Sequence, residues 1–422
     1  MSAPRILVLG GKAGIVRKAA ALGFEITHVQ KPSAFDPAVV DHCAQLLLVD
    51  YQDVPTVTAL VRALHEQRPF ARVFTQTEAA QVVAGHLTDV LGLPGNGAGP
   101  TRLLHDKPAL RELLNDKGIG PVATLRAPGR EELRAFTARH GAAVIKPAMG
   151  SGSLGVRVVA SPGETDAAWE WRERMGLTDF FAEEYLKGQE ISVETFSVAG
   201  RHTVVALTGK DTGGGVVELG HVVPAALTPG DRTAVTELVT AVLDAVGLVE
   251  GPAHSEVIVT ADGPRVVEAH SRRGGDRINE LVRLVHGVDL EEATYRLALG
   301  GEGPGAPAPQ GAAAIRFLTA TPGLVTAVTG AGAAEEAEGV VQVDVAVEPG
   351  DTVHALRWSE DRCGHVLVRA ADAATAVRLA REAADRIAIT TEPLSHRTED
   401  TLGDLLREVD EVLDPFAPAP SA

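Results

Sequence analysis

Residues 266–278, VVEAHSRRGGDRI, gather a carboxylate, an imidazole, two guanidiniums and two glycines within eight positions. Glu268 stands in a stretch that is predicted to be a strand, and the glycines follow where this strand enters a loop. Carboxylate oxygens are the ligands that Mg²⁺ prefers, and guanidinium groups bind phosphate oxygens through paired hydrogen bonds. The stretch is therefore either a combined metal and phosphate site or an ordinary charged loop.

A second carboxylate falls on a neighbouring predicted strand. The segments AHSEVIVT and PRVVEAH are expected to pair as a hairpin joined by the turn ADG, so that Glu256 and Glu268 can face one site. Paired glutamates are also common on solvent-exposed faces, but the apolar neighbours Val257 and Val267 argue against that interpretation. Two hard oxygen donors beside phosphates suit Mg²⁺, and Arg272 could reach a phosphoryl group held there.

A lysine and a glycine-rich loop follow another predicted strand. In residues 144–156, VIKPAMGSGSLGV, Lys146 ends the strand, and Gly150, Gly152 and Gly155 come after it. Glycines let backbone N–H groups approach phosphate oxygens, and an ammonium neutralises them. The segment is not a P-loop, because the lysine precedes the glycines; the alternative is a flexible turn with a solvated lysine. Only eight of the 39 basic residues are lysines, which makes each one more informative.

An acidic stretch follows in residues 181–194, FAEEYLKGQEISVE. Glu183 and Glu184 end a predicted strand, and Glu190 comes seven residues after Glu183. A carboxylate at this place can accept hydrogen bonds from ribose hydroxyls, and an extended backbone from Glu184 to Leu186 can pair with the edge of an adenine. The alternative is a solvated acidic loop.

The elements that must position these residues fall into two patterns. In the first hundred residues the strands RILVLG, FEITHV, AQLLLVD and ARVFTQ alternate with helices, which predicts a parallel sheet covered on both faces. The three glycines after the first strand do not have dinucleotide-binding spacing. The second strand ends in Gln30 and Lys31 rather than an acid, so NAD binding is disfavoured.

The remainder is predicted to be α+β, which makes the fold class α/β and α+β multidomain. TRLLHDKPALRELLNDKGIG is expected to form one amphipathic helix ended by glycine, and DRTAVTELVTAVLDAVGL a long helix. A Gly/Pro-rich stretch marks a boundary before a last α+β unit. The expected units are an N-terminal domain at 1–100, a central domain at 101–300 with subdomains 101–185 and 186–300, a linker at 301–313, a C-terminal domain at 314–412 and a disordered tail at 413–422.

Composition excludes several classes of function. The net charge of −17 argues against a nucleic-acid partner. No targeting segment and no long apolar run is evident, so we expect no membrane association. Cys43 and Cys363 are the only cysteines and are far apart, which fits a reducing cytoplasm. Small-molecule substrates are the expected partners, and a homodimer is a common default for such enzymes.

Taken in order, these segments resemble the ATP-grasp family of carboxylate–amine ligases, over nearly the whole chain. HDKPALRELL supplies a family lysine (Lys107), the strand lysine and glycine loop follow, and EEYLKGQE supplies the adenine hinge and the ribose carboxylate. The resemblance implies an ATP-grasp fold with a Rossmann-like N-terminal parallel sheet and a C-terminal α+β domain. It implies that ATP is bound by Lys107, Lys146, Gly150, Ser151, Gly152, Ser153, Glu183, Glu184, Tyr185, Leu186, Glu190 and Lys210.

Within the family, the chain is similar to bacterial L-amino-acid ligases. GKDTGGGVVELGHVVPAAL, TQTEAAQVVAGHLTDVLGLPG and the C-terminal PGDTVHALRWSEDRCGHVLV carry this likeness. It implies an ADP-forming ligase that activates a carboxylate as an acyl phosphate and gives a dipeptide or related amide, with Arg272 and Lys210 as catalytic residues. The implied substrate-binding residues are Glu78, Glu218, His221, Arg272, Arg273 and Asp276. Alternatives are a ligase using bicarbonate or a purine precursor, or an inactive ATP-binding regulatory protein.

The metal site departs from the family pattern at one position. The resemblance implies Mg²⁺ or Mn²⁺ on Glu256 and Glu268, with a third ligand two residues later. The family usually has Asn there, whereas this chain has His270. Imidazole is a softer ligand than an amide oxygen, so His270 could shift the metal preference toward Mn²⁺. The alternative is that it only hydrogen-bonds a metal-bound water.

Overall fold

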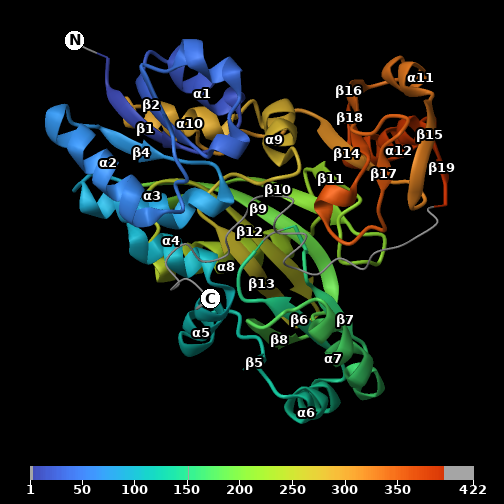
Figure 1. Cartoon of the computed structure of the whole chain (residues 1–422). Coiled ribbons are helices and arrows are strands. Elements are labelled where there is room, and N and C mark those ends of the chain that lie inside the picture. The colour runs from blue at the N-terminus through green and yellow to red at the C-terminus, as the bar shows by residue number, and fades with distance from the viewer. Residues whose placement is uncertain (1–2, 151, 394–422) are drawn as a thin grey trace.

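The computed structural model describes residues 3–150 and 152–393 (Figure 1). Ser151 and the tail predicted at 413–422 lie outside these residues. A four-stranded parallel sheet in the order β3-β2-β1-β4 forms the N-terminal region, as the alternating pattern predicts. Its strands are β1 (Arg5–Leu9), β2 (Glu25–Gln30), β3 (Gln45–Leu48) and β4 (Arg72–Phe74). Its helices are α1 (Ala13–Ala21), η1 (Pro32–Ala34), η2 (Pro37–His42), α2 (Val54–Gln67), η3 (Glu78–Ala80) and α3 (Gln81–Val90).

A small antiparallel sheet in the order β5-β8-β6-β7 comes next. Its strands are β5 (Thr124–Arg126), β6 (Ala143–Pro147), β7 (Arg157–Val159) and β8 (Phe180–Glu184). The accompanying helices are α4 (Ala98–His105), α5 (Lys107–Asp116), α6 (Arg130–His140), η4 (Pro162–Glu164) and α7 (Thr165–Arg174). A buried cluster with Leu133, Ile145 and Phe180 packs α6 and α7 against this sheet. Leu104 of α4 and Leu110 of α5 belong instead to a cluster on the large sheet.

The large sheet joins the middle of the chain to its C-terminal part. It has eight strands in the order β13-β12-β9-β10-β11-β14-β18-β16. The strands are β9 (Gly188–Val198), β10 (Arg201–Asp211), β11 (Gly220–Val223), β12 (Gly251–Thr260), β13 (Gly263–His270), β14 (Ala312–Leu318), β16 (Val340–Val345) and β18 (Gly364–Ala370). Helices α8 (Pro229–Val246), α9 (Ile278–His286) and α10 (Leu290–Ala298) connect or cover them.

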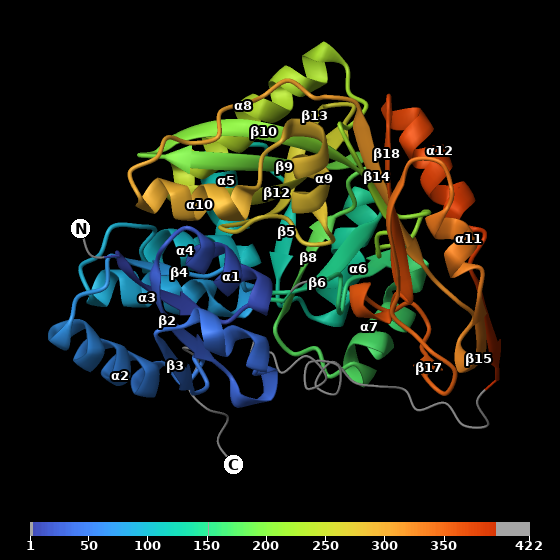
Figure 2. The ribbon, with the colours of Figure 1, turned by 90° about the horizontal axis from the view of Figure 1, so that it is seen from above.

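The C-terminal region adds a three-stranded sheet in the order β17-β15-β19. It comprises β15 (Gly323–Thr329), α11 (Ala331–Glu335), β17 (Thr352–Val353), η5 (Ser359–Asp361), α12 (Ala373–Ala384) and β19 (Ala388–Glu392). Figure 2 shows the N-terminal sheet in blue and this orange-to-red region at opposite ends of the molecule, with the green and yellow strands between them. Among the described residues, no helix combines the length and apolar character needed to cross a membrane.

The prediction of one helix over TRLLHDKPALRELLNDKGIG was wrong in one respect, because the helix is interrupted at Asp106. Helix α4 ends at His105, and the extended Asp106 caps α5 by accepting a hydrogen bond from the Ala109 N–H. Pro108 favours a new start, since proline is compatible with the first turn of a helix. The break makes Lys107 the first residue of α5. In a single continuous helix it would have been an interior residue.

The hairpin predicted for the two acidic strands is confirmed. β12 and β13 pair antiparallel, and Glu256 lies directly opposite Glu268. Side chains on one face of a strand alternate with a period of two, so directly opposed residues share a face. The two carboxylates therefore project to the same side of the large sheet.

Candidate active site

A cavity of about 1020 Å³ lies between the small sheet and the large sheet. It is lined by strands β6 and β8 on one side and by β9, β10, β12 and β13 on the other. Apart from Ser151, which is outside the described residues, every residue predicted to bind ATP lines it: Lys107, Lys146, Gly150, Gly152, Ser153, Glu183, Glu184, Tyr185, Leu186, Glu190 and Lys210.

Lys146 on β6 faces a carboxylate that is shared with a second cation. Its Nζ lies 2.7 Å from Glu183 Oε2, and the Nε of Arg111 on α5 donates to Glu183 Oε1 at 2.5 Å. Burial alone would raise the pKa of Glu183, but Lys146 and Arg111 hold it below its usual value. Two cations therefore share one carboxylate at this wall. Arg111 was not predicted, because nothing in the sequence of its helix indicates that this helix packs beside Glu183 of β8.

The glycine loop after β6 has the backbone that its composition predicts. Gly150, Gly152 and Gly155 all have positive φ, at 110°, 67° and 73°. Residues with a side chain are strained in this region, so glycine is required for this path. Hydrogen bonds connect the loop to its surroundings: Ser153 Oγ donates to the Val216 carbonyl at 2.8 Å, and Lys107 Nζ donates to the Gly150 carbonyl.

The adenine hinge predicted from the sequence also borders the cavity. The segment from Glu184 to Leu186 links β8 to β9 and lines the cavity wall. The Glu184 side chain is already used, because its Oε1 accepts the Ala123 N–H at 2.8 Å. The N–H groups of Glu184 and Tyr185 are also used, by the carbonyls of Ala123 and Ala142. What this segment can offer a base is therefore the Leu186 N–H and its backbone carbonyls.

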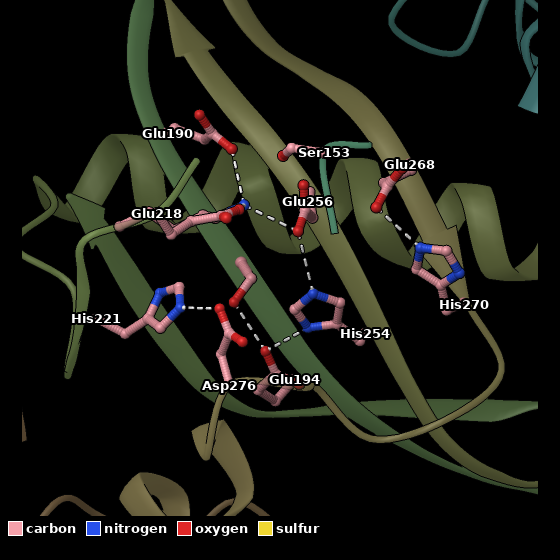
Figure 3. A network of polar contacts seen from close by, with 12 residues as sticks. Ser153, Glu190, Glu194, Glu218, His221, His254, Glu256, Glu268, His270 and Asp276 are labelled. Carbon is pink, nitrogen blue, oxygen red and sulfur yellow. Dashed lines mark hydrogen bonds and ion pairs between the residues drawn. The ribbon is translucent and has the colours of Figure 1, made fainter. Parts of the chain in front are cut away.

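Lys210 on β10 is surrounded by carboxylates. Its Nζ lies 2.8 Å from an oxygen of each of Glu190, Glu218 and Glu256, which converge on one point (Figure 3). Its side chain is only 1% exposed. Burial alone would lower the pKa of Lys210, but Glu256, Glu218 and Glu190 raise it well above its usual value. Three carboxylates therefore share one ammonium, and their oxygens lie within 4.8 Å of one another.

Glu268 is held by a separate cation. Lys107 Nζ lies 3.3 Å from Glu268 Oε2. Burial alone would raise the pKa of Glu268, but Lys107 and His270 hold it well below its usual value. Glu256 and Glu268 both line the cavity and remain ionised beside each other. Their oxygens are paired with Lys107, His270 and Lys210 in this structure. Two neighbouring carboxylates that line a cavity are nevertheless the hard donors that Mg²⁺ prefers, so these residues fit a divalent cation.

His270 does not offer a free nitrogen in this arrangement. Its Nε2 lies 3.0 Å from Glu268 Oε1, and its Nδ1 lies 3.0 Å from Oε1 of Glu78 in η3. Glu78 Oε2 accepts a hydrogen bond from the Nε of Arg272. Burial alone would lower the pKa of His270, but the two carboxylates raise it. The imidazole thus bridges two glutamates. The described residues that line the cavity include neither His270 nor Glu78.

A buried pair behind the carboxylates was missed from the sequence. His254 Nδ1 lies 2.8 Å from Glu194 Oε1, and His254 Nε2 lies 3.4 Å from Glu256 Oε1 (Figure 3). Burial alone would lower the pKa of His254, but Glu194 raises it to about 10. A usable signal was present: polar residues recur at every second position of apolar strands, as Glu190, Ser192 and Glu194 do on β9.

The paired glycines of the loop after β13 have different surroundings. A Cβ on Gly274 would come within 3.0 Å of Glu194 Oε2 and His254 Nδ1, so this glycine is needed by the buried pair. Of the two glycines, Gly275 lines the cavity and Gly274 does not. Arg273 does not line it either, among the residues described; its Nε donates to Glu291 Oε2 at 3.2 Å.

The remaining substrate candidates also border the cavity. Glu218, His221, Arg272 and Asp276 all line it. His221 Nε2 lies 3.1 Å from Asp276 Oδ2 (Figure 3). Asp276 also accepts two hydrogen bonds from Arg362, at 2.8 and 2.6 Å. Arg362 lies in the C-terminal region and was not predicted.

Comparison with known proteins places these segments in families. Residues 140–280 match the family model of the ATP-grasp domain, residues 16–95 match that of the ATP-grasp N-terminal domain, and residues 316–392 match that of the L-amino acid ligase C-terminal domain 2. An uncharacterized protein of Sinorhizobium fredii is 28% identical over 86% of this chain and 78% of its own length. The L-arginine-specific L-amino acid ligase of Bacillus subtilis is 23% identical over 72% of this chain and 76% of its own.

A solved structure shares the arrangement of the elements. The crystal structure of an L-amino acid ligase from Bacillus licheniformis superposes with a TM-score of 0.81, at 21% identity, and covers 93% of this chain and 100% of that one. A likeness at this level of identity shows that the fold is common to both chains.

Proposed function

Because this chain is an ATP-grasp ligase related to the L-amino acid ligases, we propose that it joins the carboxylate of an amino acid to an amine, with ATP converted to ADP and phosphate. The product would be a dipeptide or a related amide. The observation that carries this proposal is the cavity with two differently charged walls. Lys146 lines one wall, with the buried Arg111 behind it on the shared Glu183, and Glu190, Glu218 and Glu256 line the other. One wall suits phosphates, and the other suits cations.

The nucleotide would lie against the small sheet. Lys146 and Lys107 both line the cavity there, and the positive-φ glycines expose backbone N–H groups to phosphate oxygens. The backbone from Glu184 to Leu186 would pair with the adenine edge. Glu190 would accept from the ribose hydroxyls, in agreement with its place at the start of β9.

A divalent cation would be held by Glu256 and Glu268, whose carboxylate oxygens fit Mg²⁺. When bound, it would supply positive charge to the phosphate oxygens and so neutralise developing negative charge. Lys107 and Arg272 contribute fixed positive charge at the same place, because Lys107 contacts Glu268 and Arg272 lines the cavity.

The reaction would take place in two transfers. A carboxylate oxygen of the first substrate attacks the terminal phosphorus of ATP, and ADP leaves with an acyl phosphate behind. The nitrogen of the second substrate then attacks the acyl carbon, phosphate leaves with the bonding electrons, and the nitrogen loses a proton. Arg272 would stabilise the charge on both transition states, and the glycine loop would exclude water from the acyl phosphate.

The amino-acid substrates would meet the carboxylate-rich wall. Glu218 and His221 line the cavity beside Arg272. Glu78, which the resemblance places among the substrate-binding residues, is not one of the described residues that line the cavity and acts on it through its contact with Arg272. Burial alone would raise the pKa of Glu78, but Arg272, His270 and His105 hold it well below its usual value.

The match of residues 316–392 to the L-amino acid ligase C-terminal domain supports an amino acid over bicarbonate or a purine precursor. The test is a pairwise panel of amino acids with ATP and Mg²⁺, followed by phosphate release and product mass. We expect ADP, phosphate and a product that lacks one water relative to its two parents. Turnover that requires bicarbonate or a phosphoribosyl amine would contradict the proposal, and ATP binding without ADP formation would favour a regulatory protein.

A further inference from the structure

One arginine of the C-terminal region connects three separate parts of the site. The guanidinium of Arg362 donates to both carboxylate oxygens of Asp276 and to the Ser359 carbonyl, at 2.8, 2.6 and 2.6 Å. It stacks on the ring of Phe317 in β14, with Cζ 3.7 Å from the ring centroid. The side chain is only 9% exposed. A bidentate, stacked and buried arginine has a fixed orientation, so it can fix its partners in turn.

The partner of Arg362 lies in an unfavourable backbone conformation. Asp276 and Arg277 have φ values of 48° and 62°, so two consecutive residues with side chains are left-handed. Such conformations persist where the surroundings over-determine them. The two hydrogen bonds from Arg362 supply that constraint and also hold the pKa of Asp276 well below its usual range, although burial alone would raise it.

Asp276 in turn orients a residue of the cavity wall. His221 Nε2 lies 3.1 Å from Asp276 Oδ2, and its ring meets Phe317 edge-on at 5.8 Å. Both oxygens of Asp276 are therefore engaged within the protein. Asp276 therefore supports His221 and the neighbouring Gly275. A substrate could bind the Asp276 carboxylate only by displacing Arg362.

The same C-terminal segment also contacts the glycine loop. The Ser359 N–H donates to the Gly152 carbonyl at 3.2 Å, and Trp358 packs in the buried cluster of the small sheet. Residues Trp358 to Arg362 thus touch the phosphate end of the cavity at one side and the amino-acid end at the other.

We propose that Arg362 is a positioning residue for the amino-acid end of the cavity: it holds Asp276, and through it His221, in the conformation that receives the amino-acid substrates. The C-terminal region is then a working part of the catalytic site. This inference rests on the proposed ligase function for its kinetic test, but its structural test does not.

The kinetic test compares Arg362→Met with Arg378→Met, an arginine of the same region in an exposed pair with Glu382. The probe is the amino-acid pair that gives the fastest phosphate release with the native full-length protein. Misplacement of a reacting group by about 1 Å can cost about 100-fold, so we expect kcat/KM for the amino acids to fall about 10- to 100-fold in Arg362→Met. The Kd for ADP with Mg²⁺, measured by calorimetry, should stay within about twofold. Equal losses in both quantities, or none, would contradict the proposal.

The structural test is hydrogen exchange, which requires no turnover. In Arg362→Met, amide exchange should accelerate at 274–278 and 220–223, while the strands β9 and β12 keep native rates; Arg378→Met should match the native protein throughout. Unchanged protection at 274–278 would refute the positioning role even if the ligase function fails its own test.

A double variant separates positioning from a general contribution of Arg362 to stability. If the pair acts as one unit, adding Asp276→Asn to Arg362→Met should cost little more than Arg362→Met alone, because the unpaired buried carboxylate is removed at the same time. Additive losses in amino-acid kcat/KM would show that the two residues act separately and would overturn the inference.

Discussion

Lys146 and Lys210 face the same cavity from opposite walls, and their partners differ in charge balance. Lys146 shares one carboxylate, that of Glu183, with Arg111. Lys210 is shared by three carboxylates and has almost no exposed surface. Cations are in excess at the first wall and carboxylates at the second. A phosphate is therefore favoured beside Lys146, whereas the charge of Lys210 is already used.

The comparison shows that a buried lysine is not by itself a phosphate ligand. The resemblance to the family assigned both lysines to ATP, and the scarcity of lysines in the chain strengthened that assignment. What distinguishes them is the number of carboxylates within reach, and this depends on strands that are far apart in the chain. We infer that Lys210 serves first as a counter-charge for the acidic wall, and the predictions below test this distinction.

The largest effect is expected at Glu268, the proposed metal ligand that pairs with Lys107 rather than with Lys210. Glu268→Gln keeps the side-chain volume and removes the charge that faces Lys107 and a divalent cation. Removing one electrostatic stabiliser of a transition state costs about 100- to 1000-fold in kcat, so ADP formation should fall by about this factor. Glu292→Gln, at an exposed pair with Arg296, is the matched control. Near-native ADP formation by Glu268→Gln would show that this residue has been assigned wrongly.

Lys210→Met should make folding depend on divalent cations. The substitution leaves three carboxylates without their ammonium, and loss of one partner of a buried ion group costs about 3–5 kcal/mol. Mg²⁺ or Mn²⁺ should restore part of this stability in the variant, because a divalent cation could take the place of the ammonium. Thermal unfolding with and without MnCl₂ measures it, with the exposed Lys117→Met as control. A Tm response to Mn²⁺ equal to that of the native protein would count against a counter-charge role.

The contribution of Glu183, beside Lys146, to stability should depend on pH. A carboxyl with a lowered pKa stabilises the fold above its unfolded-state value, and that contribution disappears as the pH falls through the folded-state value. Glu183 has a lowered pKa from an ordinary 4.5. Glu183→Gln should therefore cost about 3 kcal/mol in the free energy of unfolding at pH 7. Urea unfolding at pH 7, 5, 4 and 3 measures the difference in free energy of unfolding between the native protein and the variant, which should become smaller below pH 4.5. A difference that does not change with pH would mean that the charge of Glu183 does not stabilise the fold.

Lys146→Met should weaken nucleotide binding and leave the response to divalent cations unchanged. A hydrogen bond to a charged group contributes about 1.5–3 kcal/mol, which corresponds to a roughly 10- to 100-fold rise in Kd for ADP. Calorimetric titration of ADP with Mg²⁺ measures it. If Lys210→Met weakened ADP binding by the same factor as Lys146→Met, the two walls would not differ in the way proposed.

The smallest effect is expected for His270→Asn. We considered that an imidazole at this position favours Mn²⁺, but both ring nitrogens face glutamates. The ratio of turnover with Mg²⁺ to turnover with Mn²⁺ should therefore change by less than about threefold, because no ligand atom is exchanged. A tenfold shift toward Mg²⁺ in the variant would restore the role of His270 as a metal ligand.

Features that depend on a local sequence pattern could be predicted from the sequence. A strand, a short turn and a second strand place Glu256 opposite Glu268, because register follows from the turn and the period of two. The glycine loop was predictable because glycine adopts positive φ without strain, as Gly150, Gly152 and Gly155 do. Strand alternation was also enough to predict the N-terminal parallel sheet.

Partners brought together by packing were not predictable in the same way. Arg111 lies 72 residues from Glu183, and Arg362 lies 86 residues from Asp276. No spacing rule connects such pairs, because their meeting depends on how α5 and the C-terminal segment pack on the sheets. The break at Asp106 shows a smaller failure: the amphipathic pattern continues across the cap, so periodicity alone suggested one helix.

The most direct test of the account follows one oxygen atom. An amino-acid substrate labelled with ¹⁸O in its carboxylate should pass one labelled oxygen to the released phosphate, because the carboxylate oxygen attacks phosphorus and stays with it when the amine displaces it. ADP should form in equal amount. Unlabelled phosphate, or AMP with pyrophosphate, would contradict an acyl phosphate formed between the two walls of this cavity.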